Sequence, residues 1–333
     1  PLGLEIDRAE ESYIYLKDGK RIIDLISGIA VSSLGHCHPR VIEAVRRQLD
    51  KHLHVMVYGE FVQGSQARYA AALAKVLPGG LDVVYFTMTG TEANEGALKL
   101  AKKATGRTRM VSFENSYHGD SHGSLSVTGR EVYRNPFLPL LPEVTFLPFG
   151  DISALSAIDD TVACVITEPI QGEGGIVVPS AEWHQALRKK CTETGALLIF
   201  DEIQTGFGRT GTMFAFEQFG VVPDILTLAK AMGGGMPLGA FVSSRETMNA
   251  FRTNPPLSHV TTFGGHPVSC AAALATLEVL TNENLPARAL KIEQQVRDTL
   301  KHPSIREIRG KGAMLGLDLR DADLTARVTK TCL

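Results

Sequence analysis

Five short apolar runs recur along the chain, and each ends in a polar or glycine-rich segment that a helical pattern follows. The runs are VVYFT, RMVSF, VACVIT, LLIFD and DILTL, which begin at Val83, Arg109, Val162, Leu197 and Asp224. Continuous apolar strands of about five residues that alternate with helices are typical of a parallel sheet covered on both faces. The pattern predicts an α/β fold. In such a sheet the loops at the carboxyl ends of the strands form the ligand crevice, so we expect these polar segments to share one site.

The flanking regions carry different patterns. HPVSCAAALATLEVL has the spacing of a long helix, and IREIRGKGAMLGLDL predicts short strands joined by glycine turns. Near the N-terminus, Asp18-Gly19 indicates a hairpin turn. We therefore predict a large domain at 49–265 and a smaller α+β domain that combines 266–333 with the N-terminal segment 1–48.

Composition restricts the class of protein. The 333 residues carry a net charge of −2, so no basic field would attract nucleic acid. No apolar stretch approaches the roughly 20 residues of a membrane span. Cys164 and Cys191 lie in or beside apolar runs, and no CxxC motif occurs, which predicts reduced, packed thiols. We expect a cytoplasmic protein with neither a nucleic-acid nor a membrane partner.

Lys230 stands alone between an apolar run and three consecutive glycines in LTLAKAMGGG. A buried cation is costly, so two interpretations are open. The side chain extends into solvent, which is the common outcome for lysine, or it is held inside as a reactive amine.

TGTEANEGALKL places Gly90 and Thr91 at the start of a helical pattern. Free N–H groups and the positive end of the helix dipole bind anions there, and glycine lets a phosphate approach the backbone. The alternative is a simple N-cap formed by Thr89 or Thr91. The sequence lacks a GxxxxGK[ST] loop and a GxGxxG after any strand, which argues against a nicotinamide-dependent oxidoreductase.

Two further polar segments carry candidate side chains. Asp201 ends an apolar strand, where its carboxylate either pairs with a cation or caps the next loop. Tyr117, in YHGD, can lie flat on a planar ring, and His118 lies beside it.

His118, His122 and Asp120 could also suggest a metal site, but glycine follows His118 in a turn, so we expect none. The histidines of GHCHP precede a proline and predict a structural helix entry.

Together these features fit one ligand, pyridoxal 5′-phosphate. This cofactor requires an anion site for its phosphate, a carboxylate for its ring nitrogen, an aromatic face and a lysine amine that forms a Schiff base with its aldehyde. An anionic Asp201 near the ring nitrogen would keep that nitrogen protonated, which strengthens the cofactor as an electron sink. The isolated Lys230 is then explained as the reactive amine.

The motifs also resemble a known family. GIAVSSLGHCHP, TGTEANEGALKLA, YHGD, TEPIQGEGG, FDEIQTGFGRTG, LAKAMGGGMPLGA and TTFGGHP occur in the order found in class III (ω-) aminotransferases of pyridoxal-phosphate fold type I, near the acetylornithine, ornithine and 4-aminobutyrate aminotransferases. The resemblance implies transamination between an amino acid or ω-amine donor and a 2-oxo acid acceptor. It is specific for the class and weakly specific for the substrate.

The resemblance assigns roles residue by residue. Lys230 would be the Schiff-base lysine, Asp201 the partner of the ring nitrogen and Gln204 the contact of the ring hydroxyl. The full set of implied cofactor-binding residues is Gly90, Thr91, Tyr117, His118, Glu168, Asp201, Gln204, Lys230 and Thr262. Thr262 would reach the phosphate in the neighbouring subunit, so the implied active unit is a homodimer.

Three implied substrate-site residues are Ile29, Asp120 and Glu173. Ile29 stands where the ornithine enzymes have a tyrosine, and Glu173 matches a family glutamate that pairs with a carboxylate-binding arginine. Asp120 replaces an arginine that grips a substrate carboxylate, so we expect donors with an amine or neutral far end to be preferred. The family's C-terminal RxAPPL segment does not occur in the sequence, so we expect an incomplete chain.

Two alternatives share these cofactor motifs. A pyridoxal-phosphate aminomutase would differ only in its substrates. A catalytically silent binding protein of the same fold would be expected to lose Lys230 or Asp201, and both are present.

Overall fold

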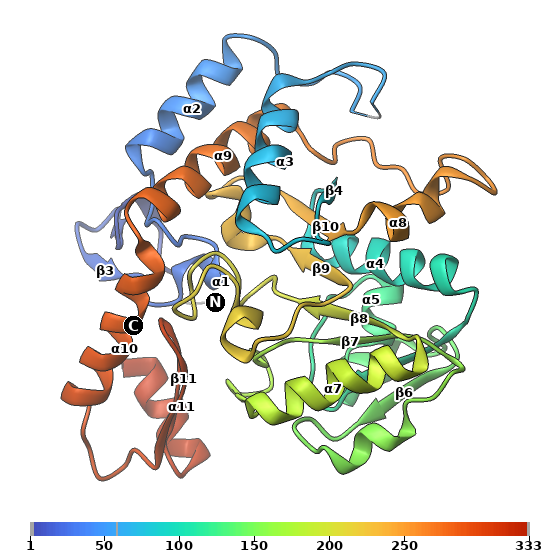
Figure 1. The fold of residues 1–333 in the computed structure, drawn as a ribbon. Helices are drawn as coiled ribbons and strands as arrows, with labels where there is room; N and C mark the ends of the chain where they lie inside the picture. Colours follow the sequence, from blue (N-terminus) through green and yellow to red (C-terminus); the bar gives the residue numbers. More distant parts are fainter. Residues whose placement is uncertain (1–2, 58, 332–333) are drawn as a thin grey trace.

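The computed structural model describes residues 3–57 and 59–331, and it is built around one large sheet (Figure 1). Within this part of the chain the sheet has seven strands in the order β4-β10-β9-β8-β7-β5-β6. Strand β10 is antiparallel to both of its neighbours, and the other pairs are parallel. The strands are β4 (Val83–Thr87), β5 (Arg109–Phe113), β6 (Val144–Leu147), β7 (Val162–Thr167), β8 (Leu197–Asp201), β9 (Ile225–Leu228) and β10 (Gly239–Ser243).

The five strands that the apolar runs predict are β4, β5, β7, β8 and β9, and the structure confirms all of them. The sequence interpretation missed β6 and β10. Strand β6 has only four residues and lies at the edge of the sheet, mostly half-buried, so it lacks the continuous apolar signature of the central strands. Strand β10 is buried throughout, but its short run GAFVS begins within the glycine-rich segment, so it does not stand out as a separate apolar run.

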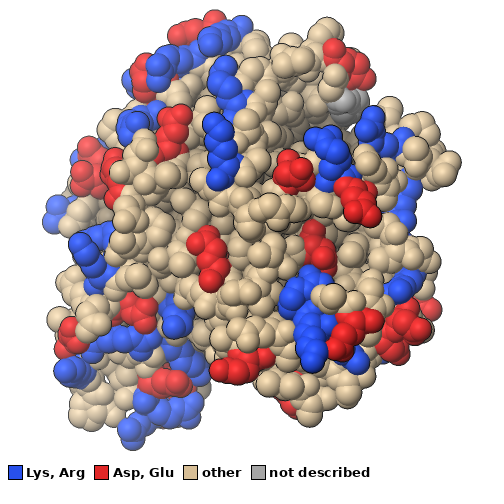
Figure 2. Space-filling model, in the orientation of Figure 1, with Lys and Arg blue, Asp and Glu red and all other residues tan. Residues whose placement is uncertain are grey.

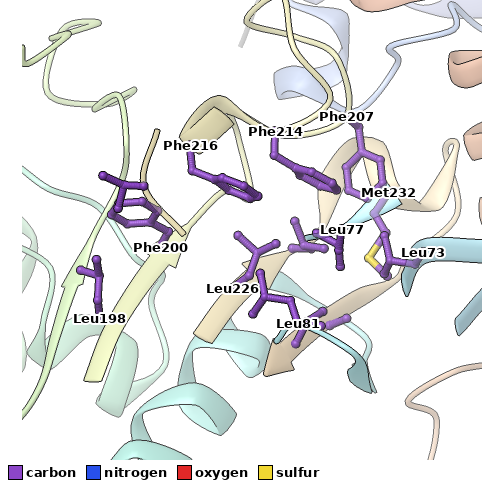
Figure 3. Packing of buried hydrophobic residues seen from close by; sticks show 14 of the residues in the cluster. Leu73, Leu77, Leu81, Leu198, Phe200, Phe207, Phe214, Phe216, Leu226 and Met232 are labelled. Carbon is purple, nitrogen blue, oxygen red and sulfur yellow. The ribbon is translucent and has the colours of Figure 1, made fainter. Parts of the chain in front are cut away.

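Helices cover both faces of the sheet. Helix α4 (Gly90–Thr105) packs on one face, and α3 (Gly64–Val76), α7 (Ala181–Thr194) and α9 (Pro267–Asn282) contribute to the core on the other. Alternate strand residues serve the two cores: Ile199 faces the α4 side, whereas Leu198 and Phe200 join the cluster shown in Figure 3. Burial on both faces explains why the strands are continuously apolar.

Helix α4 has clear start and stop signals. The Thr89 side chain caps it by accepting a hydrogen bond from the Glu92 N–H at 3.3 Å, and Gly106 ends it in the left-handed conformation. Gly96 lets the helix approach the sheet, since an added Cβ would lie 2.3 Å from the Phe241 ring. These features fix the start of α4 at the carboxyl end of β4.

Two small sheets lie outside this core. One contains β1 (Ile6–Glu10), β2 (Tyr13–Leu16) and β3 (Arg21–Ile23), and the other contains β11 (Glu307–Lys311) and β12 (Met314–Asp318). The β2–β3 and β11–β12 hairpins confirm the turns that glycine predicts. The division into 1–48, 49–265 and 266–333 stays a prediction.

The remaining helices are shorter or peripheral. They are α1 (Ser27–Ala30), α2 (Pro39–Leu49), α5 (His122–Ser126), α6 (Glu131–Arg134), α8 (Arg245–Met248), α10 (Leu285–Thr299) and α11 (Ala322–Thr331). Among the described residues, no helix combines the length and apolar character needed to cross a membrane. Figure 2 shows acidic and basic side chains mixed over one face of the molecule.

Candidate active site

A cavity of about 490 Å³ opens at the carboxyl ends of the parallel strands, where the sequence predicts the site. Its walls include nine of the predicted residues: Gly90, Thr91, Tyr117, His118, Asp120, Glu168, Asp201, Gln204 and Lys230. The loops that follow β4, β5, β7, β8 and β9 each contribute at least one of them. The parallel topology therefore brings together residues that are 140 positions apart.

Asp201 lies at the end of β8 with its carboxylate buried. One oxygen, Oδ2, accepts a hydrogen bond from Asn94 Nδ2 at 2.8 Å and lies 2.8 Å from Nδ1 of His118. The other oxygen, Oδ1, accepts from the Ile203 backbone N–H at 3.1 Å. These contacts fix the orientation of the carboxylate within the cavity wall.

Asn94 is a site residue that the sequence interpretation missed. Its Nδ2 bridges Asp201 and the backbone oxygen of His118, the latter at 2.7 Å. A signal was available, because this amide lies beside Ala93 and Ala97 on the apolar side of α4, and buried amides need partners. Nε2 of His118 and Oδ1 of Asn94 are buried with no partner among the described residues.

Lys230 lies directly after β9, half-buried, with a backbone φ of 50° in the left-handed region. For a long side chain this conformation is strained, and such strain is concentrated at functional sites. Burial lowers the pKa of the Lys230 amine, while the carboxylates of Asp201, Glu173 and Glu168 oppose that change. Lowering this pKa enlarges the fraction of neutral, nucleophilic amine.

The start of α4 forms the anion-binding end of the cavity. Thr89 is the N-cap, so Gly90 and Thr91 are the first helical residues, where backbone N–H groups have no intrahelical partner. A Cβ at Gly90 would lie 2.7 Å from Ile203 Cδ1. The Thr91 hydroxyl is 2.5 Å from the Ser121 hydroxyl. The close packing at Gly90 explains why a larger residue would not fit here.

Tyr117 and Asp120 form a hydrogen-bonded pair at the cavity wall. The Tyr117 hydroxyl donates to Asp120 Oδ2 at 2.8 Å, and burial followed by this hydrogen bond raises the pKa of the phenol. The Tyr117 backbone N–H donates to Glu168 Oε2 at 3.2 Å. Burial raises the pKa of Glu168 to about 7. The tyrosine ring is thus held from both its hydroxyl and its backbone.

The two acidic residues at the end of β8 have different surroundings. Glu202, next to Asp201, does not line the cavity: its carboxylate accepts hydrogen bonds from the Ala215 and Phe216 N–H groups, each at 2.8 Å. Glu202 therefore secures the loop after the strand, whereas Asp201 faces the cavity. Gln204 lines the cavity, and its amide lies against Gly172, where an added Cβ would fall 1.8 Å from Gln204 Oε1.

Three predicted residues lie outside this set. Ile29, Glu173 and Thr262 are exposed and do not line the cavity. Glu173 is close enough for its charge to raise the pKa of both Lys230 and Tyr117. The roles predicted for these three residues stay predictions.

The histidines that suggested a metal site have other contacts. His118 lies against Asp201, and His36 Nε2 is 2.8 Å from Asp24 Oδ2. Within residues 3–57 and 59–331, no cluster of three or more His, Cys, Asp or Glu side chains could hold a metal ion. Helix α2 begins at Pro39, which confirms the predicted helix entry.

The cavity fits pyridoxal 5′-phosphate. Its volume lies in the range of small-molecule sites, about 300–1,000 Å³. The start of α4 supplies N–H donors for a phosphate, and the unpaired buried atoms of His118 and Asn94 mark a wall that a polar ligand would complete. Lys230 supplies an amine whose ammonium has no hydrogen bond to another described residue.

The model for the family described as aminotransferase class III matches residues 1–332. The chain belongs to the class III aminotransferases. Membership confirms the predicted fold type I, the pyridoxal 5′-phosphate cofactor and the transamination of an amino donor with a 2-oxo acid. It also favours transamination over the aminomutase and silent-protein alternatives.

The sequences of several aminotransferases align with most of this chain. It is 43% identical to an acetylornithine aminotransferase from Methanopyrus kandleri over 94% of the chain and 80% of that protein. It is also 43% identical to one from Bacillus subtilis, over 95% of the chain and 82% of that protein. An ornithine aminotransferase structure from Toxoplasma gondii matches with a TM-score of 0.90 and 32% identity, over 96% of this chain and 78% of that one. The structure of an (S)-enantioselective ω-transaminase from Thermomicrobium roseum matches with a TM-score of 0.89 and 33% identity, over 96% of this chain and 79% of that one.

Proposed function

We propose that Lys230 holds the cofactor covalently and that Asp201 faces the ring nitrogen. Support comes from the lowered pKa of Lys230 and from the buried Asp201 carboxylate in the same cavity wall. The N–H groups of Gly90 and Thr91 would bind the phosphate. When bound, pyridoxal 5′-phosphate supplies an electron sink for the carbon that loses its proton. Nζ of Lys230, once free, would carry that proton between the donor carbon and the cofactor carbon.

The covalent role of Lys230 can be tested on the holoenzyme. Sodium borohydride fixes the cofactor to the lysine that holds it, and peptide mapping then locates the modified residue. We expect the phosphopyridoxyl mass on Lys230, because its amine is desolvated and lies at the cavity. Lys102, on α4 outside the cavity, is an internal control. A modification found on any other lysine would contradict the assignment.

We infer that the amino donor is the terminal amine of a basic amino acid whose α-amine is either free or acetylated. The relatives named acetylornithine aminotransferases support the N-acetylated form. Asp120 supports a basic donor, because its exposed carboxylate lies at the cavity wall and bears no ion pair to another described residue. Like charges about 4 Å apart cost between about 1 and 4 kcal/mol in partly solvated settings. A donor that ends in a lone carboxylate, such as 4-aminobutyrate, would be repelled.

A donor panel with 2-oxoglutarate as the fixed acceptor tests this specificity. Ornithine and putrescine should each exceed 4-aminobutyrate in kcat/KM by about tenfold or more. N-Acetylornithine also carries a lone carboxylate at its far end, beside a neutral amide, so its kcat/KM tests the form that the relatives' names support and not the charge of Asp120. Asp120→Asn should narrow that gap, because it removes the charge and leaves an acceptor for the Tyr117 hydroxyl. Tyr117→Phe is the matched control that removes the hydrogen bond and keeps the charge. The donor proposal is wrong if 4-aminobutyrate proves the best amine.

We also propose that the active unit is a homodimer in which Thr262 enters the partner's site. Support comes from the position of Thr262, which is exposed and lies outside the cavity of its own chain. Large apolar side chains are exposed near the same segment and in 53–62, including Val62 at 92% and Phe61 at 60%. The two segments meet where the rings of His54 and Phe263 lie 5.0 Å apart, and exposed apolar side chains on neighbouring segments are typical of subunit interfaces.

A further inference from the structure

The segment 253–262, which carries Thr262, is tied to the last turns of α4 by two lysines. Nζ of Lys103 donates to the Thr253 backbone oxygen at 2.6 Å and to the Ser258 hydroxyl at 2.9 Å. Nζ of Lys99, one turn earlier, lies 3.1 Å from Nδ1 of His259. An ammonium can only donate, so Nδ1 of His259 must be the acceptor.

His259 is partly buried and packs against three aromatic rings. The Phe251 ring stacks on it with centroids 5.4 Å apart, and the rings of Tyr85 and Phe241 lie at 5.2 and 5.9 Å. The Tyr85 hydroxyl donates to the His259 backbone oxygen at 2.8 Å. We call the five residues Lys99, Tyr85, Phe241, Phe251 and His259 the His259 anchor. The anchor uses both the side chain and the backbone of His259, so it fixes the chain three residues before Thr262.

The ionisation of His259 agrees with this geometry. Burial, together with the Lys99 ammonium, lowers its pKa to about 4, although the Glu95 carboxylate opposes this change. Glu95 itself is engaged by the N–H groups of Gly123 and Ser124 at 2.7 and 3.1 Å. The imidazole is therefore neutral near pH 7 and keeps a free lone pair on Nδ1 for Lys99.

We infer that Lys99 and His259 are positioning residues that hold Thr262 in place for the active site of the partner subunit. Helix α4 then serves two sites: its first turn lines the cavity of its own chain, and its last turns hold the segment that would reach the other. Simple packing of a surface loop would not require a charged donor to Nδ1 of a ring that already packs against three aromatic side chains. The inference rests on the homodimer proposed above.

Cofactor retention by the holoenzyme provides the first test. His259→Phe keeps the ring and removes the acceptor, and Lys99→Met removes the donor. Each should raise the dissociation constant of pyridoxal 5′-phosphate on the order of tenfold, because a misplaced Thr262 loses a charge-assisted hydrogen bond. Lys99→Arg should restore retention. Lys102→Met is the matched control, since Lys102 makes no hydrogen bond to 253–262 in the described chain. Unchanged retention in both His259→Phe and Lys99→Met would overturn the inference.

Hybrid dimers with two affinity tags decide which site depends on the anchor. In the first hybrid, one subunit carries Lys230→Ala with His259→Phe and the other is unchanged. The only competent lysine then relies on Thr262 from the variant subunit, so we expect weakened cofactor retention there. In the second hybrid, Lys230→Ala and His259→Phe lie on different subunits, and retention should be normal. The reverse pattern would overturn the inference, since the effect would then be local to each chain.

A monomeric holoenzyme would overturn the homodimer and this inference together. A dimer whose cofactor retention does not depend on His259 would overturn the inference alone.

Discussion

At the scale of single residues, Asp201 is held by three neighbours in the site. Asn94, His118 and Ile203 surround its two carboxylate oxygens. Asp201→Ala removes a negative charge beside the proposed ring nitrogen and the carboxylate that contacts Asn94, His118 and Ile203. We expect kcat to fall more than about a hundredfold, which corresponds to roughly 3 kcal/mol of lost transition-state stabilisation. Single-turnover kinetics at measured cofactor occupancy would check this value.

The matched control for Asp201 is Asn94→Ala. It removes a neutral partner and keeps the carboxylate, so we expect a smaller loss of kcat than in Asp201→Ala. Asp201→Ala within threefold of the parent would contradict the electrostatic role.

At the scale of elements, helix α4 lines the cavity with its first turn and contacts His259 near its last turns. The contact with His259 predicts a pH dependence of stability. Burial lowers the pKa of His259 from 6.5 to about 4, so between these values the unfolded chain binds more protons than the folded one. The stabilisation is therefore complete above about pH 6.5 and is lost as the pH falls through about 4. Lys99 and Tyr85 face the imidazole directly, and Glu95 acts on it through its charge.

Thermal unfolding between pH 6.5 and 4 measures this effect. The parent should lose stability more steeply than His259→Phe, because the variant has no group that titrates at this position. Lys102→Met should follow the parent. Parallel curves for the parent and His259→Phe would show that His259 does not titrate as described.

For the whole molecule, the proposed homodimer predicts complementation between inactive variants. Lys230→Ala should abolish turnover, and Thr262→Ala should weaken cofactor retention in both sites, because a charge-assisted hydrogen bond to phosphate contributes about 1.5–3 kcal/mol. Mixed subunits regain one complete site, made of Lys230 from one chain and Thr262 from the other. We expect the activity of mixtures to exceed that of either variant at limiting cofactor. Sedimentation of a fully active monomer would refute the shared site.

The sequence by itself determined five strands of the central sheet and most of the residues around its cavity. Strands buried on both faces must be apolar along their whole length, so β5, β7, β8 and β9 are visible as runs. Their carboxyl ends meet at one edge of the sheet, and for that reason Tyr117, Asp201 and Lys230 could be expected together.

Only the tertiary structure decided which polar side chains face one another. Asn94 contacts Asp201 across 107 positions, and Lys99 contacts His259 across 160, and local periodicity carries no information about such partners. The same holds for Glu202, which directly follows Asp201 in the sequence but accepts hydrogen bonds from the Ala215 and Phe216 N–H groups outside the cavity. Periodicity records which side of an element is buried, whereas the partner of a buried polar group depends on how distant elements pack.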